Sequence, residues 1–566
     1  MSEPRYTDVL VVGAGPVGLL TALGLAQHSL DTFIIDRRER DVQKMFGRAT
    51  TLYPRSVELL EQVGLAETFC QAGFVGRLAV NYRNGKRVNH RGWGSMFEPW
   101  NKSFHDYALS IRQKNSEELI RQDYYKTSGK DVWYGWQLQA FAIDEGKADG
   151  YNVSATISHP EAGEVQIRSK YIVGADGGSS TVRRLANIQM EGSNTVYQWI
   201  RIDGKMETSM PDANIGFAAV ESAHHGNVLW VKLDQDAHRI GFALNSRILE
   251  KYPNGSLTEA DAVREAQEAM TPFTLEIKRL DWWTQYKIRQ NVATTLLLDK
   301  YVLLAGDAAH VHSSGFAQGM NTGIHDATNL IWKLSGMLKG WYKPAVLESY
   351  NTERHAAAKQ LIAIDMEAAA LISGDIPSKY QSSGLTAHEV LANLMKESMD
   401  FSSGLGVKYM ESELNRPLQA TMLQAGSRAP DVLIRGPGPH LPFRLQGQVL
   451  HALPIGWNVL VFAGDYRSTQ KQLIAARESF RVLQEKTLPL RIATILSGPG
   501  VDIWAAFDGP PLGKVYFDAD GSAHAKYGVS LESGAAVVIR PDGITAFATM
   551  LDEVGDVTAY FDEVFQ

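Results

Sequence analysis

Cysteine is almost absent from this sequence of 566 residues. Cys70 is the single cysteine, so the chain can form no internal disulfide, no thiolate metal cluster and no Cys-x-x-Cys redox pair. Cysteine usage of this kind is typical of a reducing compartment, and we therefore expect a cytoplasmic protein.

Long apolar stretches and concentrated basic charge are missing as well. No run of about 18 apolar residues occurs, so we expect no transmembrane helix. We also expect no signal peptide, because only the residues MSEPRYTD precede the first apolar run. A formal net charge of -7 without a long basic run argues against nucleic acid and against an anionic membrane as partners.

Composition and length indicate what kind of protein remains. Hydrophobic residues make up 44% of the chain and charged residues 21%, which are the proportions of a globular protein. One hydrophobic core rarely extends over so long a chain, so we expect about two to four domains.

A strand, a glycine-rich turn and a helix are predicted near the N-terminus. After an apolar run that ends at Val12, Gly13, Gly15 and Gly18 have the spacing G-x-G-x-x-G and open an apolar helix. The first glycine permits a tight turn, the second lets the backbone approach a pyrophosphate, and the third lets helix and strand pack closely. The next predicted strand ends at Asp36, about 20 residues further on, where a carboxylate can bind the ribose of an adenosine. The segment predicts a Rossmann-type dinucleotide site.

Two further acids follow predicted strands. Asp176 and Gly177 come after YIVGA, and Asp307 comes after YVLLAG. Open α/β sheets bind ligands at the carboxyl ends of their strands. A long helix then begins near Gly319, where unpaired backbone N–H groups and the helix dipole favour negative charge. Together these turns predict a cradle for a polyhydroxy, anionic ligand.

The rest of the chain predicts additional domains. Alternating apolar and polar residues from about 194 to 244 indicate an inserted antiparallel sheet, and Ser256 with Glu259 forms a predicted helix capping box. We expect a discontinuous nucleotide-binding domain (1–190 and 290–372), a substrate domain (191–289 with part of 64–110), a helical linker (373–427) and a separate α/β domain (428–566).

The three motifs together resemble the single-component FAD-dependent aromatic hydroxylases. The likeness rests on G-x-G-x-x-G with Asp36, on the Asp176–Gly177 pair, and on GDAAH, QGMNTG and DATNLIWKL between residues 306 and 334. In particular the chain resembles the phenol 2-monooxygenase branch. This resemblance implies an α/β fold with a Rossmann-type FAD-binding domain, an inserted antiparallel-sheet substrate domain, and a C-terminal thioredoxin-like domain that supports a homodimer. With no cysteine beyond Cys70, that domain would be redox-inactive.

The resemblance also implies a set of site residues. Asp307 would bond the ribityl chain of FAD, and Asp176 would serve both FAD and NADPH. Tyr286 would lie beside flavin and substrate, and we expect it and Arg48 to be the catalytic residues. The implied cofactor-binding residues are Gly13, Gly15, Pro16, Gly18, Asp36, Arg37, Arg48, Gln113, Asp176, Tyr286, Asp307, Gly319, Met320 and Asn321.

Two positions depart from the pattern of the family. The phenol branch carries an acid in the loop after the position of Arg48, where this chain has Thr50, and the usual Pro-Pro after GDAAH is replaced within Ser313–Phe316. Both positions bear on the substrate and on the base that would activate it. No metal site is expected, because His310 and His312 have no further obvious ligands nearby in the sequence.

The implied activity is the hydroxylation of a phenolic or related aromatic substrate by O2, through a flavin C4a-hydroperoxide. The glycine motif occurs only once, so NADPH would bind transiently. The residues alone leave other functions open. Arg37 and Arg38 would also suit the 2′-phosphate of NADP in a plain NAD(P)-dependent dehydrogenase. An FAD-dependent oxidase or dehydrogenase, an epoxidation or oxidative decarboxylation of a polyketide-like aromatic, and a non-catalytic binding protein are further alternatives.

Overall fold

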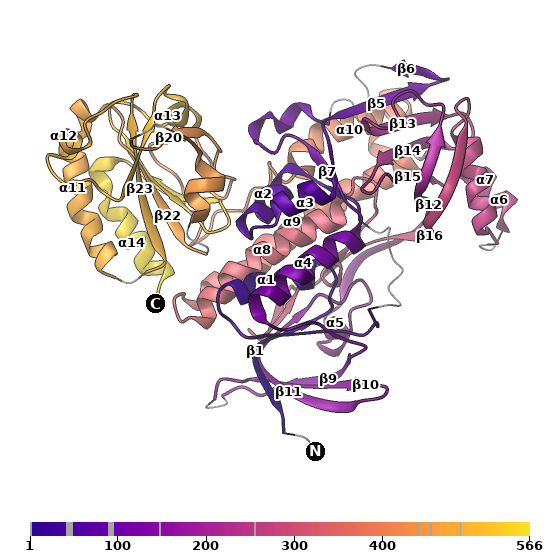
Figure 1. Cartoon of the computed structure of the whole chain (residues 1–566), viewed down its shortest axis with the longest axis horizontal. Helices are drawn as coiled ribbons and strands as arrows, with labels where there is room; N and C mark the ends of the chain where they lie inside the picture. Colours follow the sequence, from indigo (N-terminus) through magenta and orange to yellow (C-terminus); the bar gives the residue numbers. More distant parts are fainter. Residues whose placement is uncertain are drawn as a thin grey trace.

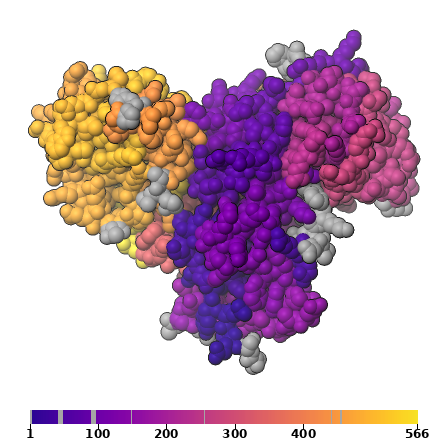
Figure 2. All heavy atoms as spheres, viewed as in Figure 1, coloured from indigo at the N-terminus to yellow at the C-terminus, as the bar shows by residue number. Residues whose placement is uncertain are grey.

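The computed structural model describes residues 3–40, 49–88, 96–146, 149–253, 256–438, 441–452, 455–486 and 488–566. Three parts follow one another across the molecule (Figure 1): a C-terminal α/β domain, a central nucleotide-binding domain, and a large antiparallel sheet. In the space-filling view the C-terminal domain forms a separate lobe beside the central one (Figure 2). Among the described residues, no helix is both long enough and apolar enough to cross a membrane.

The central domain is built on a mainly parallel sheet with the strand order β17-β18-β11-β1-β2-β8. In register, Val12 of β1 pairs with Gly174 of β11, and Gly174 pairs with Leu304 of β18. The three motif-bearing turns therefore leave the sheet at the same edge. The strands are β1 (Arg5–Val12), β2 (Thr32–Asp36), β8 (Trp133–Tyr134), β9 (Gln137–Ile143), β10 (Val153–His159), β11 (Gly163–Gly174), β17 (Leu297–Leu298) and β18 (Val302–Leu304).

Helices cover this sheet, and a small sheet lies beside it. Apolar residues of α1 pack on those of α8, the long helix of the central motif, and both contribute to the largest part of the core. The helices are α1 (Pro16–Gln27), α2 (Pro54–Gln62), α3 (Ala66–Ala72), α4 (Gln113–Ser128), α5 (Thr181–Leu185), α8 (Gln318–Leu338) and α9 (Pro344–Ile372). The small sheet consists of β3 (Thr51–Leu52), β4 (Phe74–Gly76) and β7 (Ala108–Ser110).

The second large sheet has the order β19-β16-β12-β15-β14-β13-β5-β6. Its long strands β12 and β16 run antiparallel, so that Arg201 pairs with Thr284 and Trp199 pairs with Tyr286. The strands are β5 (Leu78–Arg83), β6 (Lys86–Val88), β12 (Met190–Thr208), β13 (Gly216–Ser222), β14 (Gly226–Lys232), β15 (His238–Ala243), β16 (Leu275–Ala293) and β19 (His310–Val311). Helices α6 (Ser246–Lys251) and α7 (Glu259–Ala269) lie at its far side (Figure 1).

The capping box of α7 differs from the sequence prediction. It is formed by Thr258 and Asp261, whose side chains exchange hydrogen bonds with each other's backbone N–H groups. The prediction of Ser256 with Glu259 was wrong by two residues, because both pairs have the same spacing and only the start of the helix distinguishes them.

The C-terminal domain has the thioredoxin-like arrangement that was predicted. Strand β22, helix α11 and the parallel strand β23 are followed by the antiparallel pair β25 and β26 and then by α14. The sheet order is β21-β20-β24-β23-β22-β25-β26. The strands are β20 (Leu433–Arg435), β21 (Pro442–Arg444), β22 (Trp457–Phe462), β23 (Leu490–Ser497), β24 (Lys514–Asp518), β25 (Ala535–Ile539) and β26 (Thr545–Thr549). The helices are α11 (Tyr466–Glu485), α12 (Ile503–Phe507), α13 (Ser522–Tyr527) and α14 (Gly555–Val564), and α10 (Ala387–Ser402) lies in the preceding segment.

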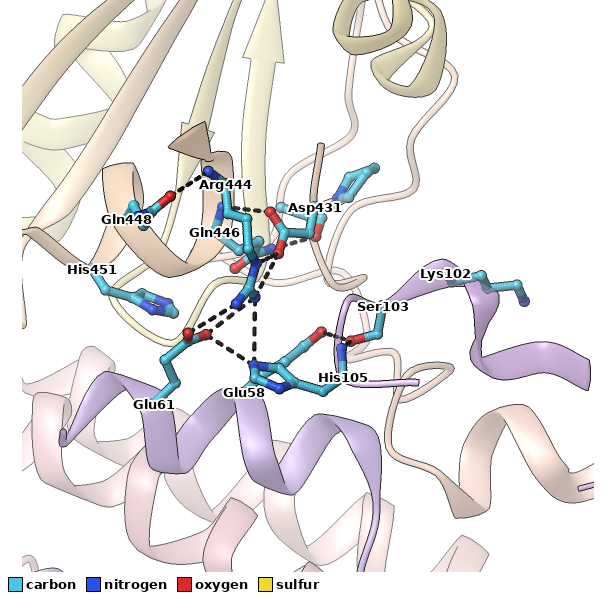
Figure 3. Close-up of polar contacts among 12 residues, drawn as sticks. Glu58, Glu61, Lys102, Ser103, His105, Asp431, Arg444, Gln446, Gln448 and His451 are labelled. Atoms are coloured by element: carbon cyan, nitrogen blue, oxygen red, sulfur yellow. Dashed lines mark hydrogen bonds and ion pairs between the residues drawn. The ribbon is translucent and has the colours of Figure 1, made fainter. Parts of the chain in front are cut away.

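Ion pairs join the C-terminal domain to α2 of the central domain. Arg444 bonds Asp431 of its own domain at 2.9 Å and Glu61 of α2 at 2.9 Å, and His105 contacts the same Glu61 carboxylate at 3.1 Å (Figure 3). Burial opposes the charge of Glu61, but His105 and Arg444 hold its pKa below the usual value. Arg428 reaches the neighbouring carboxylate of Glu58 at 2.6 Å. These contacts fix α2 against the domain interface.

A second, fully buried ion cluster joins the same domains through α8 and α9. Glu353 of α9 accepts from Lys333 of α8 at 2.7 Å and from Arg540 of the C-terminal domain at 2.9 Å. Arg540 also bonds Asp542 at 2.7 Å. Burial opposes the charge of Glu353, yet the two cations hold its pKa well below the usual range.

Replacement of Arg540 should destabilise the protein strongly. Arg540→Met would leave Glu353 and Asp542 buried without their shared cation, and we expect the free energy of unfolding to fall by about 3–5 kcal/mol. Lys486→Met is the matched control, because Lys486 pairs with Asp562 at the surface and is 43% exposed; there we expect about 1 kcal/mol or less. Urea unfolding followed by tryptophan fluorescence measures both, and equal losses would contradict the role assigned to the buried cluster.

Candidate cofactor and substrate site

A cavity of ≈ 640 Å³ lies where the carboxyl ends of the parallel strands meet one face of β16. It joins the glycine turn, both acid-bearing turns and the large sheet in one continuous space. The predicted site residues that line it are Gly13, Gly15, Pro16, Asp36, Arg37, Gln113, Asp176, Tyr286, Asp307, Gly319 and Met320. Arg48, predicted to be both catalytic and cofactor-binding, lies outside the described residues.

The glycine turn after β1 leaves backbone donors open to the cavity. Gly13 has φ +104, and a Cβ there would lie 2.4 Å from the Ala175 carbonyl oxygen, so only glycine fits. Gly15 is the N-cap of α1, which begins at Pro16, and no side chain caps the helix in the described structure. The first N–H groups of α1 are therefore available to an anion such as a pyrophosphate. Gly18 is not part of the lining and instead packs against the Gly13 carbonyl.

Asp36 stabilises the glycine turn from the end of β2. Its carboxylate accepts hydrogen bonds from the backbone N–H groups of Ala14 and Arg38, each at 2.9 Å. The acid is therefore fixed at the rim of the cavity, with lone pairs left for a hydroxyl donor. Gln113, at the start of α4, lines the cavity nearby and exchanges backbone and side-chain bonds with Ala49.

The two acid-bearing turns are held differently. Asp176 is half-buried and accepts from the backbone N–H groups of Thr181 and Val182 at the start of α5, although the loss of hydration there still raises its pKa. Asp307 is exposed to the cavity. Between the turns, Arg183 donates to the carbonyl oxygens of Ala308 at 2.8 Å and Gly178 at 2.9 Å. Sequence patterns assigned no role to Arg183, which joins the two turns.

Asp326 of α8 holds the turn that contains Asp307, and sequence analysis did not identify this role. Asp326 of α8 accepts from the backbone N–H of Gly306 at 2.9 Å, and its side chain is paired with His310 at 2.7 Å and with Arg354 at 2.7 Å. An acid in the apolar helix DATNLIWKL was the available signal, because a carboxylate is buried only where it has partners.

The start of α8 forms another open helix terminus at the cavity. Ala317 precedes it with φ +54, no side chain caps it within the described structure, and a Cβ on Gly319 would meet its nearest atom only at 3.9 Å. Asn321 points elsewhere: it accepts from the N–H of Tyr53 at 2.8 Å and donates to the Thr51 carbonyl at 2.9 Å. Asn321 thereby holds β3 in place and supports Thr51 and Tyr53, which line the cavity.

The opposite wall of the cavity comes from the large sheet. Trp282, Thr284 and Tyr286 alternate along β16 and so share one face. The Tyr286 hydroxyl makes a short contact with the Ser314 hydroxyl, and Ser314 also accepts from Arg201 at 3.1 Å. Phe217, Leu229 and Val231 add an apolar surface to this wall.

A second buried arginine borders this wall. Arg239 of β15 binds Asp203 with both ends of its guanidinium, at 2.7 and 2.8 Å, and donates to the Thr50 hydroxyl at 3.2 Å. Thr50 occupies the position where the resemblance to the phenol branch implies an acid, and here its hydroxyl accepts a hydrogen bond from Arg239, which Asp203 already neutralises. Sequence reasoning did not select Arg201 or Arg239, because strand pairing alone brings them to the cavity.

The histidines that lie near other possible metal ligands are engaged in hydrogen bonds. His310 is paired with Asp326, and His312 is bonded to the Ser313 carbonyl at 2.8 Å. Another group, His225, Glu265 and Glu268, is close enough to hold an ion, but the ammonium of Lys251 already donates to Glu265. Hydrogen bonds to protein groups therefore explain the positions of His310, His312 and His225.

The donors and acceptors of the cavity fit FAD. The uncapped start of α1 suits the pyrophosphate. Asp36 suits the hydroxyl groups of the ribose, and the exposed Asp307 suits those of the ribityl chain. The start of α8 suits the electron-rich edge of a flavin. The remaining space faces Tyr286 and the apolar wall, and an aromatic ring fits there.

Comparisons with known proteins agree with this geometry. Residues 6–365 match the family described as FAD binding domain, and residues 475–566 match the phenol hydroxylase C-terminal dimerisation domain. The chain is 26% identical over 606 residues to a phenol 2-monooxygenase of Aspergillus fumigatus, covering 98% of this chain and 96% of that protein. It is 27% identical over 625 residues to the 3-hydroxybenzoate 4-monooxygenase of Comamonas testosteroni, covering 99% and 95%.

A solved structure shares the fold over the whole length. The ternary complex of aklavinone-11 hydroxylase with FAD and aklavinone aligns with a TM-score of 0.73 at 22% identity, covering 100% of this chain and 99% of that one. With the family match over more than half of its length, the chain belongs to the FAD-binding-domain flavoproteins and is an FAD-dependent aromatic monooxygenase with a phenol hydroxylase C-terminal dimerisation domain.

Proposed function

We propose that the protein hydroxylates a phenolic or related aromatic compound with O2 and NADPH. The observation that carries this proposal is the continuous cavity, which joins the nucleotide-binding turns to the face of Trp282, Thr284 and Tyr286. We also propose that Asp307, Gly319 and Met320 contact the FAD, as the family resemblance implies. Bound FAD would supply the exchange of electrons between the nicotinamide and O2.

The residues of the chain would position the ring and exclude water. Phe217, Leu229 and Val231 provide the apolar surface that desolvates an aromatic ring. Tyr286 and Ser314 place hydroxyl groups at the same wall. Because Thr50 cannot act as a carboxylate base, we assign the orientation of the substrate oxygen to Tyr286.

Two further features of the proposal concern partners. The glycine motif occurs once in the sequence, which favours transient rather than permanent binding of NADPH, with Arg37 and Arg38 at the cavity rim. The match to the phenol hydroxylase dimerisation domain favours a homodimer.

The proposal is tested by a screen of phenols and hydroxylated aromatic acids with the FAD-loaded protein. We expect some of them to stimulate NADPH oxidation and to gain the mass of one oxygen atom. Stimulation that gives only hydrogen peroxide, or an oxidised product without added oxygen, would instead favour an oxidase or dehydrogenase.

Removal of the Tyr286 hydroxyl should uncouple the reaction. Tyr286→Phe keeps the ring that packs against Trp199 and removes the contact with Ser314. We expect normal FAD content and a product yield per NADPH that falls roughly tenfold to a hundredfold, as hydrogen peroxide rises. Parallel measurement of product and peroxide decides this, and unchanged coupling would leave Tyr286 as a packing residue.

Replacement of Asp307 should weaken FAD binding. Asp307→Ala removes the carboxylate that is exposed to the cavity, and we expect the dissociation constant of FAD to rise about tenfold or more. Asp123→Ala, an acid of α4 paired with Lys126 at the surface, is the control. Fluorescence titration of the apoprotein with FAD measures both variants, and a wild-type affinity in Asp307→Ala would refute the assigned contact.

A further inference from the structure

Arg201 differs in its partners from the other buried arginines beside the large sheet, Arg112 and Arg239. Its side chain lines the cavity and is buried, with the whole residue only 6% exposed. It donates to the Ile200 carbonyl at 2.9 Å and to the Ser314 hydroxyl at 3.1 Å, both of which are neutral. Within the described part of the chain, no carboxylate lies at ion-pair distance from it.

Its buried neighbours are neutralised inside the protein. Arg239 binds Asp203 through two nitrogens, and Arg112 binds Asp234 at 2.6 Å and Asp281 at 2.8 Å. The negative charge of Asp203 is thus engaged by Arg239. Asp281 also pairs with Arg279 at 2.5 Å, so these three carboxylates already face three arginines, and Arg201 adds a fourth cation for which the described residues offer no carboxylate at ion-pair distance.

The surrounding residues hold the Arg201 guanidinium in place. Gly241 lies opposite it on β15, and a Cβ there would come within 2.5 Å of its Nη1 atom. The guanidinium also lies over the Trp199 ring, 5.1 Å from the centroid. Glycine at 241 leaves the space, while Trp199 and Ser314 fix the orientation, so the cation is part of a formed subsite.

A buried cation without a counter-charge is unfavourable. Burial lowers the pKa of Arg201, but an arginine remains charged at neutral pH. Proteins retain such charges where an anion is bound, because charge-assisted hydrogen bonds then offset the lost hydration. The anion must be able to enter the cavity. The pyrophosphate of FAD is assigned to the start of α1, whereas Arg201 lies at the wall of Tyr286 and Ser314, where the substrate would bind.

We propose that Arg201 binds an anionic oxygen of the aromatic substrate, with Ser314 and Tyr286 as the adjoining hydroxyl groups. This inference rests on the proposed function and specifies its substrate class, an aromatic compound that is negatively charged when bound. The charge is carried by a ring carboxylate or by a phenolate, since both present an oxyanion of similar hydrogen-bonding chemistry.

A cation at this position explains how the site functions with Thr50 in place of an acid. A carboxylate base would take the proton of a phenol, whereas Arg201 would lower the pKa of the phenol, so that the substrate loses its proton to water on binding and is held as the phenolate. In the carboxylate case the same contact fixes the ring in one orientation. In both cases Tyr286 and Ser314 share the hydrogen-bonding network of the bound oxygen.

The test measures ligand binding to the oxidised FAD-loaded protein, without NADPH and therefore without turnover. Benzoate and 3-hydroxybenzoate are titrated against their neutral amides, and changes in flavin absorbance give the dissociation constants. We expect the wild type to bind at least one of the anions about tenfold or more tightly than its amide. In Arg201→Met the affinity for that anion should fall at least about 30-fold, and the affinity for the amide less than about threefold.

Three other variants make the result specific to the guanidinium. Lys205→Met removes an exposed cation from the same strand, where it lies 3.5 Å from Asp236, and should leave the anion affinity unchanged. Arg201→Lys keeps the charge and should retain part of the preference. Gly241→Ala keeps Arg201 itself but displaces its guanidinium, and should reduce the preference; FAD content confirms that each variant is folded.

A separate titration distinguishes the phenolate from the carboxylate. If the oxyanion is a phenolate, 4-nitrophenol bound below its ordinary pKa shows the absorbance of its ionised form in the wild type and not in Arg201→Met, and benzoate shows no advantage over its amide. Absence of both the carboxylate preference and the phenolate signal would overturn the proposal, as would equal losses for anions and amides in Arg201→Met. Since no oxygenation is measured, failure of the monooxygenase proposal would be seen separately, in the product screen.

Discussion

The buried carboxylate of Asp326 is the contact on which the arrangement of the site depends. It lies on α8, two turns beyond the start of the helix that faces the cavity, and it binds the backbone N–H of Gly306 directly before Asp307. Burial opposes its charge, but His310 and Arg354 hold the pKa of Asp326 well below its usual range. One charged group therefore sets the position of the turn relative to the helix start, and these are the two features that would border a flavin.

This contact continues into the attachment of the C-terminal domain. Arg354 bonds Asp326 and the hydroxyl of Tyr409 at 3.2 Å, and Arg540 of the C-terminal domain lies over the Tyr409 ring at 5.2 Å. Arg540 then meets Glu353, which neighbours Arg354 in sequence on α9. A buried polar network of this kind is stabilising only when all its members are satisfied, so the cavity and the domain interface depend on the same set of charges.

The sequence was informative where a function is encoded locally. The turns at Gly13, Asp176 and Asp307 could be located because each follows an apolar strand, and parallel pairing brings the ends of such strands to one edge. Arg201 and Arg239 could not be found, because they reach the cavity only through the pairing of β12 with β15 and β16. Thr258 was misplaced because two equivalent capping boxes overlap in the sequence. Asp326 was read as part of a motif, but its partners are distant in the sequence and only the fold shows them.

The site thus combines a cofactor-binding turn that Asp326 of α8 holds in place with a substrate-binding wall that contains the positive charge of Arg201. We expect FAD binding to depend on the Asp326 carboxylate, although Asp326 does not line the cavity. The most direct test of this dependence is the variant Asp326→Asn. This change keeps the shape of the side chain but removes the charge that Gly306, His310 and Arg354 share. We expect the dissociation constant of FAD, measured by fluorescence titration of the apoprotein, to rise about tenfold or more in a folded variant. An unchanged FAD affinity in Asp326→Asn would contradict the dependence of the cofactor site on this buried contact.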